Sequence, residues 1–253
     1  MMIIKFGGHA MKDSQGLFAA SIKMALSKGN KVIVVHGGGP QINAELAKLK
    51  IESHFVNGFR FTTEEIFAVV ERVLTQVVGP EVASNLNFHG VKAQSISAKD
   101  SGILFAESIK DLGRVGKVSK VEKISLDTLL SKGIVPVIAP IASDVDNGLG
   151  LNINADLAAA AISSAYPDST LIIMTDVAGI YRNWPDQSSL IDEISASDLE
   201  SLKSTFSDGM LPKVEAVLEA IAAGAHSVRI IDGTSESSFD QALIGIGGTL
   251  VHA

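Results

Sequence analysis

A lysine followed by two glycines ends the first apolar run of the chain, in the segment Lys5-Phe6-Gly7-Gly8. At the end of a parallel strand, such a lysine would project from the carboxyl edge of the sheet, where open α/β folds bind their ligands. The glycines would let backbone N–H groups approach an anion closely. Taken alone, however, the segment is more simply explained as a strand end followed by a glycine turn.

A stronger signal for anion binding is the segment His36-Gly37-Gly38-Gly39-Pro40, which follows a run of β-branched residues. Pro40 suits the first position of a helix, because its missing N–H would have no partner there. Three glycines next to a helix N-terminus form a cradle for an anion. A tight turn rarely needs three consecutive glycines, so the cradle is the favoured interpretation. We expect His36 to be a hydrogen-bonded residue at the strand end and not a catalytic base.

Amide and carboxylate side chains gather in the segment Asn152-Ile153-Asn154-Ala155-Asp156, at the start of an alanine-rich helix. A purely structural explanation exists, because Asn154 could cap this helix and its dipole would favour Asp156 in the first turn. Against that explanation, we expect Asn152 and Asp156 to face the carboxyl edge of the sheet together with Lys5.

Two further cations occupy positions that a ligand would explain. Lys213 ends the segment Asp208-Gly209-Met210-Leu211-Pro212-Lys213 at an expected helix start, where a positive charge opposes the helix dipole. An anionic ligand would relieve that conflict. Arg60 ends the segment Asn57-Gly58-Phe59-Arg60 and could pair with a carboxylate through two hydrogen bonds. A lone arginine in a hairpin, however, is more often a solvated surface group.

Several known chemistries are excluded by missing motifs. The chain has no G-x-x-x-x-G-K-[ST], no G-x-G-x-x-G, no H-E-x-x-H and no G-x-S-x-G. It has no cysteine, which excludes disulfides, thiolate metal sites and cysteine nucleophiles. The six histidines are scattered, so a histidine metal cluster is not expected.

Composition is that of an ordinary globular protein, with 46% hydrophobic and 19% charged residues in a chain of 253. The net charge of −7 argues against a nucleic-acid binder, which needs a basic face. No export signal is recognisable, and the longest apolar stretches are shorter than a membrane span. We therefore expect a cytoplasmic protein with no membrane partner.

Short β-branched runs alternate with helix-length amphipathic segments. The expected strands are Met2–Phe6, Lys31–His36, Val91–Ile96, Ile134–Ala139, Thr170–Met174 and Ser227–Ile231. The expected helices are Gln15–Ser27, Pro40–Leu49, Thr63–Val77, Leu126–Leu130, Asn154–Ala165, Ala196–Lys203 and Lys213–Ala222. Nearly continuous apolar strands are typical of a sheet covered on both faces. The alternation therefore predicts an α/β fold, a three-layer sandwich around a mainly parallel central sheet.

Three other segments, Phe55–Phe61, Ile103–Val121 and Ala142–Ile153, resemble hairpins, and the last contains the tight-turn signal Asn147-Gly148. Neither a repeat nor a low-complexity linker interrupts the chain. We place a lobe boundary near Pro167, which gives a first lobe of residues 1–167 and a second lobe of residues 168–253.

Taken together and in this order, the segments resemble those of the amino-acid kinase family over nearly the whole chain. The matching motifs are Lys5-Phe6-Gly7-Gly8, His36-Gly37-Gly38-Gly39-Pro40, Asn57-Gly58-Phe59-Arg60, Asn152-Ile153-Asn154-Ala155-Asp156, Thr175-Asp176-Val177-Ala178-Gly179-Ile180-Tyr181 and Asp208-Gly209-Met210-Leu211-Pro212-Lys213. The arginine segment and Asn-x-Asn-Ala-Asp favour the branch that phosphorylates N-acetyl-L-glutamate over aspartate, carbamate or uridylate kinases. The resemblance implies transfer of the γ-phosphoryl group of MgATP to the γ-carboxylate, giving an acyl phosphate in arginine biosynthesis.

The resemblance also implies catalytic roles at four positions. Lys5 and Lys213 would stabilise the transferring phosphoryl group. Asp156 would hold these two lysines in place, and Gly8 would donate its backbone N–H to the phosphate. A carboxylate acceptor is already ionised at neutral pH, so the reaction needs no general base. We expect Mg²⁺ to be carried by the ATP phosphates and not by a dedicated protein site.

Substrate contacts are implied in the same way. Gly38 and Gly39 would bind the carboxylate that is phosphorylated, while Arg60 and Asn152 would bind the α-carboxylate and acetamide end. The implied nucleotide contacts are Asp176, Val177, Ala178, Gly179, Ile180, Tyr181, Thr205, Phe206 and Ser207. The first lobe would then bind the acid and form a dimer surface, and the second would bind the nucleotide.

The resemblance extends to assembly and to competing functions. Arginine-inhibited members of the family carry an extra N-terminal helix, whereas this chain begins in its first strand, so we expect an arginine-insensitive homodimer. The nearest alternative is a related acid kinase, such as one acting on carrier-bound aminoadipate. A catalytically silent sensor of nucleotide or amino acid is a second, although two lysines flanking the phosphoryl path speak against it. A nicotinamide dehydrogenase is disfavoured because the dinucleotide fingerprint is absent.

Overall fold

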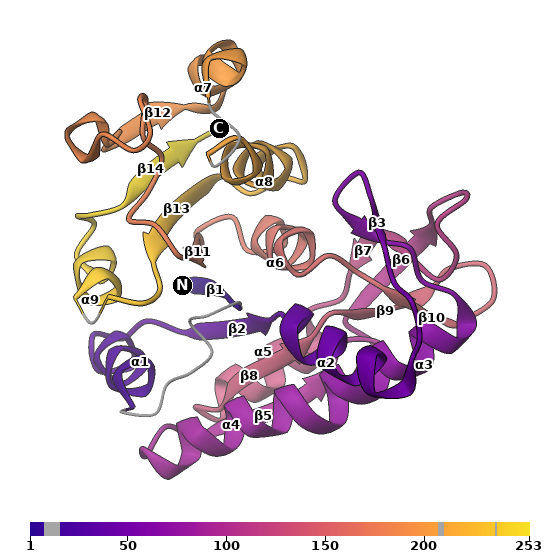
Figure 1. Cartoon of the computed structure of the whole chain (residues 1–253). Coiled ribbons are helices and arrows are strands. Elements are labelled where there is room, and N and C mark those ends of the chain that lie inside the picture. The colour runs from indigo at the N-terminus through magenta and orange to yellow at the C-terminus, as the bar shows by residue number, and fades with distance from the viewer. Residues whose placement is uncertain (8–15, 207–209, 236) are drawn as a thin grey trace. The chain divides into compact units, whose positions relative to one another are not determined.

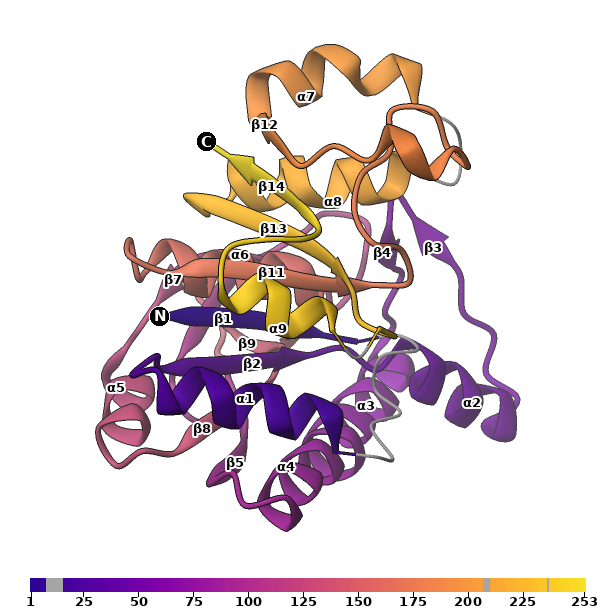
Figure 2. The same ribbon diagram turned by 90° about the vertical axis from the view of Figure 1, so that its left-hand side faces the viewer.

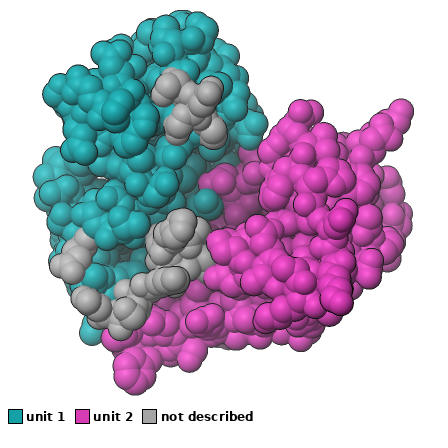
Figure 3. Space-filling view, in the orientation of Figure 1, with its two compact units in different colours: residues 1–32, 159–253 teal, residues 33–158 magenta. Residues whose placement is uncertain are grey.

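The computed structural model describes residues 1–7, 16–206, 210–235 and 237–253. The chain is an α/β protein with a large, mostly parallel central sheet, which confirms the predicted fold class (Figure 1). It divides into two compact units, one formed by residues 1–32 and 159–253 and the other by residues 33–158 (Figure 3). No helix within the described ranges is long and apolar enough to cross a bilayer.

The first unit is built on five strands in the order β12-β14-β13-β11-β1, and only the β13–β14 pair is antiparallel. These strands are β1 (Met2–Phe6), β11 (Thr170–Thr175), β12 (Glu193–Ser195), β13 (Ser227–Asp232) and β14 (Thr249–His252). The helices of this unit are α1 (Leu17–Ser27), α7 (Ala196–Leu202), α8 (Leu211–Ala222), α9 (Ser238–Leu243), most of α6 (Ala155–Ser164) and the 3₁₀ turns η3 (Gln187–Ser189) and η4 (Lys203–Thr205).

Helices on both faces explain why the strands of this unit are so apolar. Figure 2 shows α1 and α9 in front of the strands and α8 behind them. On the front face, the ring of Phe18 in α1 stacks on Phe6 in β1, with ring centroids 4.1 Å apart. Phe18 also meets Phe239 of α9 edge-on at 6.0 Å. This aromatic cluster fixes both helices against the carboxyl end of β1, and so positions the strand end that carries Lys5.

The second unit contains three parallel strands in the order β2-β8-β5 and a separate four-stranded sheet in the order β10-β9-β6-β7. Its strands are β2 (Val32–His36), β3 (Phe55–Val56), β4 (Phe59–Arg60), β5 (Ala93–Ser97), β6 (Leu104–Ser108), β7 (Gly116–Val121), β8 (Val135–Ala139), β9 (Ile141–Asp144) and β10 (Gly150–Asn152). Its helices are α2 (Gly39–Leu49), α3 (Glu64–Arg72), the π-helical segment η2 (Val73–Val78), α4 (Gly79–Phe88) and α5 (Ile124–Ser131).

The predicted elements are present with small shifts at their ends, and the three expected hairpins are confirmed as antiparallel pairs. The expected helix Thr63–Val77 is longer than predicted, because it continues through η2 into α4. Among the described elements, α9, β12, β14 and the 3₁₀ turns η3 and η4 were not predicted. The compact units place residues 1–32 with the C-terminal part of the chain. The division into functional lobes at Pro167 stays a prediction.

Candidate active site

The glycine turn between β2 and α2 offers backbone donors on an open side. Gly38 is the N-cap of α2, Pro40 lies in the first turn, and no side chain caps this helix end. A Cβ atom on Gly38 would lie 2.6 Å from Cδ2 of Leu74, whereas a Cβ on Gly39 would meet no atom of the described residues within 4 Å. The turn is therefore packed against the protein at Gly38 and open at Gly39, as a cradle for an anion requires.

His36 precedes this turn and is completely buried. Its Nδ1 lies 2.8 Å from the carbonyl oxygen of Gly37. A carbonyl oxygen can only accept, so Nδ1 carries the proton and donates it in this bond. Burial lowers the pKa of His36 to about 4. The ring is therefore neutral at physiological pH, and the prediction of a hydrogen-bonded residue is confirmed.

The low pKa of His36 predicts a loss of stability in mild acid. The unfolded chain protonates this residue near its ordinary pKa of 6.5 and the folded chain only near 4, so the unfolded state binds more protons between these values. The stabilisation is complete above pH 6.5 and is lost as the pH falls towards 4. At pH 5 the loss from this residue is about 2 kcal/mol. Urea unfolding at pH 7.5 and pH 5 tests this prediction. Between these two pH values, the free energy of unfolding should fall by about 2 kcal/mol less in His36→Asn than in the native chain.

Arg60 lies at the end of β4 and is only 7% exposed, and its hydrogen-bond partners are neutral side chains. Its Nη1 donates to Oγ of Ser53 and its Nη2 to Oδ1 of Asn43, both at 2.7 Å. The guanidinium also lies 4.7 Å from the ring centroid of Phe55. No carboxylate in the described part of the chain pairs with it. The alternative of a solvated surface arginine is therefore wrong, and a buried, charged fork is available to a carboxylate ligand.

Asn152 is joined to the arginine strand through the buried hydroxyl of Thr62. Its Nδ2 donates to Oγ1 of Thr62 at 3.3 Å, and the same hydroxyl donates to the carbonyl oxygen of Arg60 at 2.6 Å. The two residues predicted for one end of the substrate are thus brought together by a single side chain. Thr62 itself carries no sequence signal that would have identified it.

The backbone of residues 113–115 runs between Thr62 and Asn152 and connects them a second time. Thr62 forms an isolated parallel β-bridge with Gly113, and Val115 forms another with Asn152. The N–H of Arg114 donates to the carbonyl oxygen of Thr62 at 2.7 Å, and the N–H of Asn152 donates to that of Arg114 at 2.8 Å. This crosspiece, residues 113–115, fixes the spacing between the arginine and asparagine strands.

We expect Gly113→Ala to destabilise the protein by about 3 kcal/mol, through left-handed strain plus a backbone clash. Gly113 has φ +72°, and a Cβ there would lie 2.3 Å from the carbonyl oxygen of Thr62. Gly133 is a matched control, because its φ is +68° and a Cβ there would have no neighbour within 4 Å in the part of the chain that the structure describes. Gly133→Ala should cost about 1 kcal/mol. Equal shifts of the urea midpoint in the two variants would show that the crosspiece is not tightly held.

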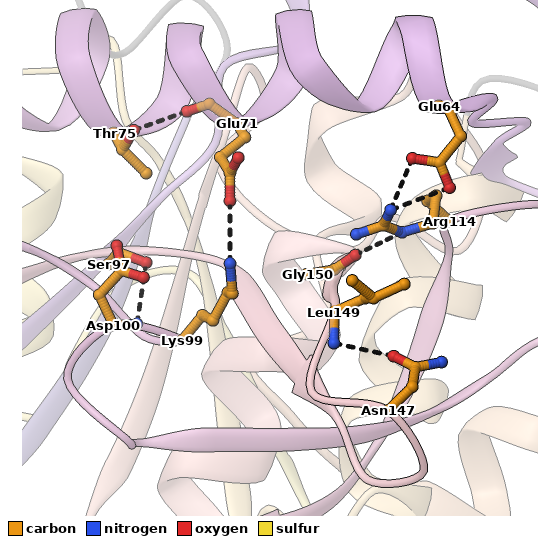
Figure 4. A network of polar contacts seen from close by, with 10 residues as sticks. All are labelled: Glu64, Glu71, Thr75, Ser97, Lys99, Asp100, Arg114, Asn147, Leu149 and Gly150. Atoms are coloured by element: carbon orange, nitrogen blue, oxygen red, sulfur yellow. Dashed lines mark hydrogen bonds and ion pairs between the residues drawn. The ribbon is translucent and has the colours of Figure 1, made fainter.

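A polar network supports the crosspiece from α3 (Figure 4). Nη1 of Arg114 pairs with Glu64 at 2.6 Å, and its Nε donates to the carbonyl oxygen of Gly150 at 2.8 Å. The guanidinium also lies 4.3 Å from the ring centroid of Phe67. Arg114 therefore ties α3 to β10, the strand that ends in Asn152. No sequence pattern indicated this role for Arg114.

Asn154 has the capping role that the structural explanation assigned to it. Its Oδ1 accepts from the N–H of Asp156 at 2.8 Å and from that of Leu157 at 3.4 Å. Asp156 lies in the first turn of α6 and belongs to the second compact unit. Its role in holding the lysines stays a prediction.

In the first unit, two of the predicted site residues form an ion pair. Nζ of Lys213, in the first turn of α8, lies 3.2 Å from Oδ1 of Asp176, which follows β11. Lys5 lies on the neighbouring strand β1, paired in parallel register with Ile173 of β11. Both lysines therefore lie towards the carboxyl ends of parallel strands in this unit. Gly8 and Ser207, and with them Asp208-Gly209, lie outside the described residues.

The predicted nucleotide segment 176–181 is anchored by Thr249 of β14. The N–H of Ile180 donates to Oγ1 of Thr249 at 2.7 Å, and this hydroxyl donates to the carbonyl oxygen of Ile191 at 2.6 Å. A Cβ on Gly179 would lie 2.5 Å from the same Oγ1, so the segment approaches β14 as closely as only glycine allows. Tyr181 is buried and lies 5.2 Å from Trp184 between ring centroids.

The remaining nucleotide residues have local contacts. Oγ1 of Thr205 donates to the carbonyl oxygen of Leu202 at 2.7 Å, and Phe206 is buried. Val177 exchanges hydrogen bonds with Thr175, while Asp176 is exposed and Ala178 is half-buried. Within residues 1–7, 16–206, 210–235 and 237–253, no group of three His, Cys, Asp or Glu side chains could hold a metal ion.

Comparison with known proteins gives consistent matches. The model of the amino acid kinase family matches residues 1–232. An acetylglutamate kinase of Paenarthrobacter aurescens is 43% identical over 92% of this chain and 79% of its own length. One of Streptomyces coelicolor is 40% identical over 94% of this chain and 81% of its own.

Solved structures agree with this fold. The protein smu.665 of Streptococcus mutans has a TM-score of 0.84 and 28% identity, covering 100% of this chain and 98% of its own. An N-acetylglutamate synthase of Neisseria gonorrhoeae has a TM-score of 0.83, covering 100% of this chain and 59% of its own. At 22% identity, the second likeness is evidence for the fold alone.

Proposed function

The chain belongs to the amino acid kinase family, and on that premise we propose that it is an acetylglutamate kinase of arginine biosynthesis. It transfers the γ-phosphoryl group of ATP to the γ-carboxylate of N-acetyl-L-glutamate and releases ADP and an acyl phosphate. The choice of acceptor rests on the curated relatives, acetylglutamate kinases 39–43% identical over most of this chain. The buried Arg60, joined to Asn152 through Thr62, is the structural observation that supports it.

At the substrate end, Arg60 binds the α-carboxylate through its guanidinium fork. Hydrogen bonds to Asn43 and Ser53 fix the orientation of the guanidinium group. Its charge has no carboxylate partner within the described ranges. Asn152 binds the acetamide group, since an amide side chain can both donate and accept. The fixed spacing between the strands that carry Arg60 and Asn152 then favours acids whose α-carboxylate and acetamide group are separated by the matching distance.

At the phosphoryl end, the amides of Gly38 and Gly39 bind the γ-carboxylate and align one of its oxygens with the γ-phosphorus of ATP. That oxygen forms the new P–O bond while the bond from the γ-phosphorus to the β–γ bridging oxygen breaks, and the electron pair leaves with ADP. No proton needs removal, because the carboxylate is ionised at neutral pH. The buried, neutral His36 is consistent with such a mechanism.

Negative charge on the transferring group is compensated from the protein side by Lys5, Lys213 and the Gly8 amide, with Asp156 holding the lysines. The Lys213–Asp176 ion pair at 3.2 Å supports a fixed position for one ammonium group. Magnesium enters as part of MgATP and supplies further charge compensation on the phosphates. The nucleotide contacts are those of the segment 176–181 and of Thr205, Phe206 and Ser207.

Assembly and location belong to the same proposal. We propose a homodimer in the cytoplasm that has no nucleic-acid or membrane partner. Light scattering after size exclusion gives the mass of the assembly, and the mass of a single chain would contradict the dimer.

ADP release with a panel of acceptors tests the proposed substrate. We expect turnover with N-acetyl-L-glutamate, and at least roughly tenfold lower kcat/KM with L-glutamate, which lacks the acetamide, and with N-acetyl-L-aspartate, which is one methylene shorter. ATP binding without turnover of any acceptor would favour a silent sensor. Turnover of aminoadipate derivatives alone would favour the related acid kinase.

A further inference from the structure

Resting on the function proposed above, we propose that His36 is a positioning residue for the Gly38 amide, the donor next to the reacting carboxylate. His36 does not touch substrate in this role and exchanges no proton with it. It acts by fixing the direction of one peptide plane in the glycine cradle.

The Gly37–Gly38 peptide links the His36 ring to the Gly38 amide. The carbonyl oxygen of Gly37 accepts a hydrogen bond from Nδ1 of His36 at 2.8 Å. In a trans peptide the C=O and the N–H point in opposite directions. Anchoring the Gly37 oxygen on the buried ring therefore turns the N–H of Gly38 away from His36. Within the described ranges this N–H donates to no backbone or side-chain acceptor, so it remains available to a ligand.

The ring of His36 is itself packed closely against Gly79. A Cβ on Gly79 would lie 3.0 Å from Nε2 of His36 and 2.5 Å from Oγ of Ser95. Gly79 follows η2, which is the one π-helical segment in the part of the chain that the structure describes. Leu74 of η2 also packs against Gly38, where a Cβ would lie 2.6 Å from its Cδ2. Residues in and directly after the π-helix thus hold both the histidine and the glycine, and π-helical turns occur often at functional sites.

The two ring nitrogens of His36 have different roles. Nε2 is buried and has no hydrogen-bond partner among the described residues. With the proton on Nδ1, Nε2 is a hydrogen-bond acceptor that faces Gly79. A proton on Nε2 would find no hydrogen-bond acceptor among the described residues. The arrangement therefore depends on a donor at the δ position only. A donor one bond further along the side chain would not reproduce it.

Two amide variants separate the δ position from the ε position. His36→Asn places an amide donor near the position of Nδ1, whereas His36→Gln places it near Nε2, against Gly79. We expect His36→Gln to lower kcat about tenfold with KM for ATP within twofold of native, because the reacting carboxylate is misaligned. His36→Asn should keep kcat within about threefold of native. His226→Gln, at an exposed histidine, is the matched control and should leave both constants unchanged.

A second readout does not depend on turnover. In ¹H–¹⁵N spectra, the Gly38 amide resonance should shift in His36→Gln and return close to its native position in His36→Asn. Folded variants that are alike in kcat and in this resonance would overturn the positioning role. If the native chain releases no ADP with any acceptor, the proposed function fails, and the resonance alone decides whether His36 sets the direction of the Gly38 amide.

Discussion

Replacing Lys213 with alanine is expected to lower kcat by roughly 10²–10³, the effect of losing one preorganised donor to a transition state. The Lys213 side chain is only 21% exposed at the start of α8, and its Nζ lies 3.2 Å from Oδ1 of Asp176. A cation at a helix N-terminus is unfavourable unless an anion lies nearby. Because the charge that it compensates develops during transfer, kcat should fall much more than KM for either substrate changes.

Lys120 provides the control for this experiment. Lys120 lies on β7 of the four-stranded sheet, and its side chain is 63% exposed. It pairs with Glu122, the residue that follows this strand. Lys120→Ala should leave kcat unchanged, since an exposed ion pair contributes little. Steady-state kinetics of both variants by ADP release decides the matter, and a kcat near the native value in Lys213→Ala would remove this lysine from the phosphoryl path.

Replacing Arg60 with lysine is expected to raise KM for N-acetyl-L-glutamate by roughly 10²-fold and to leave KM for ATP within twofold of native. Lysine keeps the positive charge but cannot present two parallel N–H donors to a carboxylate. It also cannot satisfy Asn43 and Ser53 in the same plane. A charge-assisted hydrogen bond contributes about 1.5–3 kcal/mol, which sets this scale.

The same substitution at Arg72 is the control, because Arg72 is 43% exposed and pairs with Glu45. Arg72→Lys should change neither KM. An Arg60→Lys variant with a native KM for acetylglutamate but a reduced melting temperature would show that Arg60 is a structural residue and not a substrate ligand.

The fold was predictable where the pattern along the chain is strong. Strands such as β1 and β8 are nearly continuous apolar runs because helices cover both faces of the sheet. The elements α9, β12 and β14 were missed because they are only three to six residues long and carry little periodicity. The π-helical turn η2 was also missed, because π-helices are rare and most of this segment fits the pattern of the preceding α-helix.

The candidate site also contains some features that could be predicted from the sequence and others that could not. The glycine turn after His36 could be predicted, because its function requires unusual local sequence. Burial of Arg60 could not, because its partners Asn43 and Ser53 are brought to it only by the folded backbone. The crosspiece residue Gly113 lies 51 positions after Thr62 in the sequence, and no local pattern links the two. Supporting residues of this kind become visible only in the structure.

Trapping with hydroxylamine tests the central claim, phosphoryl transfer to a carboxylate of N-acetyl-L-glutamate, most directly. An acyl phosphate reacts with hydroxylamine to give a hydroxamate, whose mass and fragmentation identify the modified carboxylate. We predict a γ-hydroxamate that requires both MgATP and N-acetyl-L-glutamate and falls with kcat in Lys213→Ala. Folded native protein that releases no ADP and gives no hydroxamate, or that gives the α-hydroxamate, would contradict the proposed reaction.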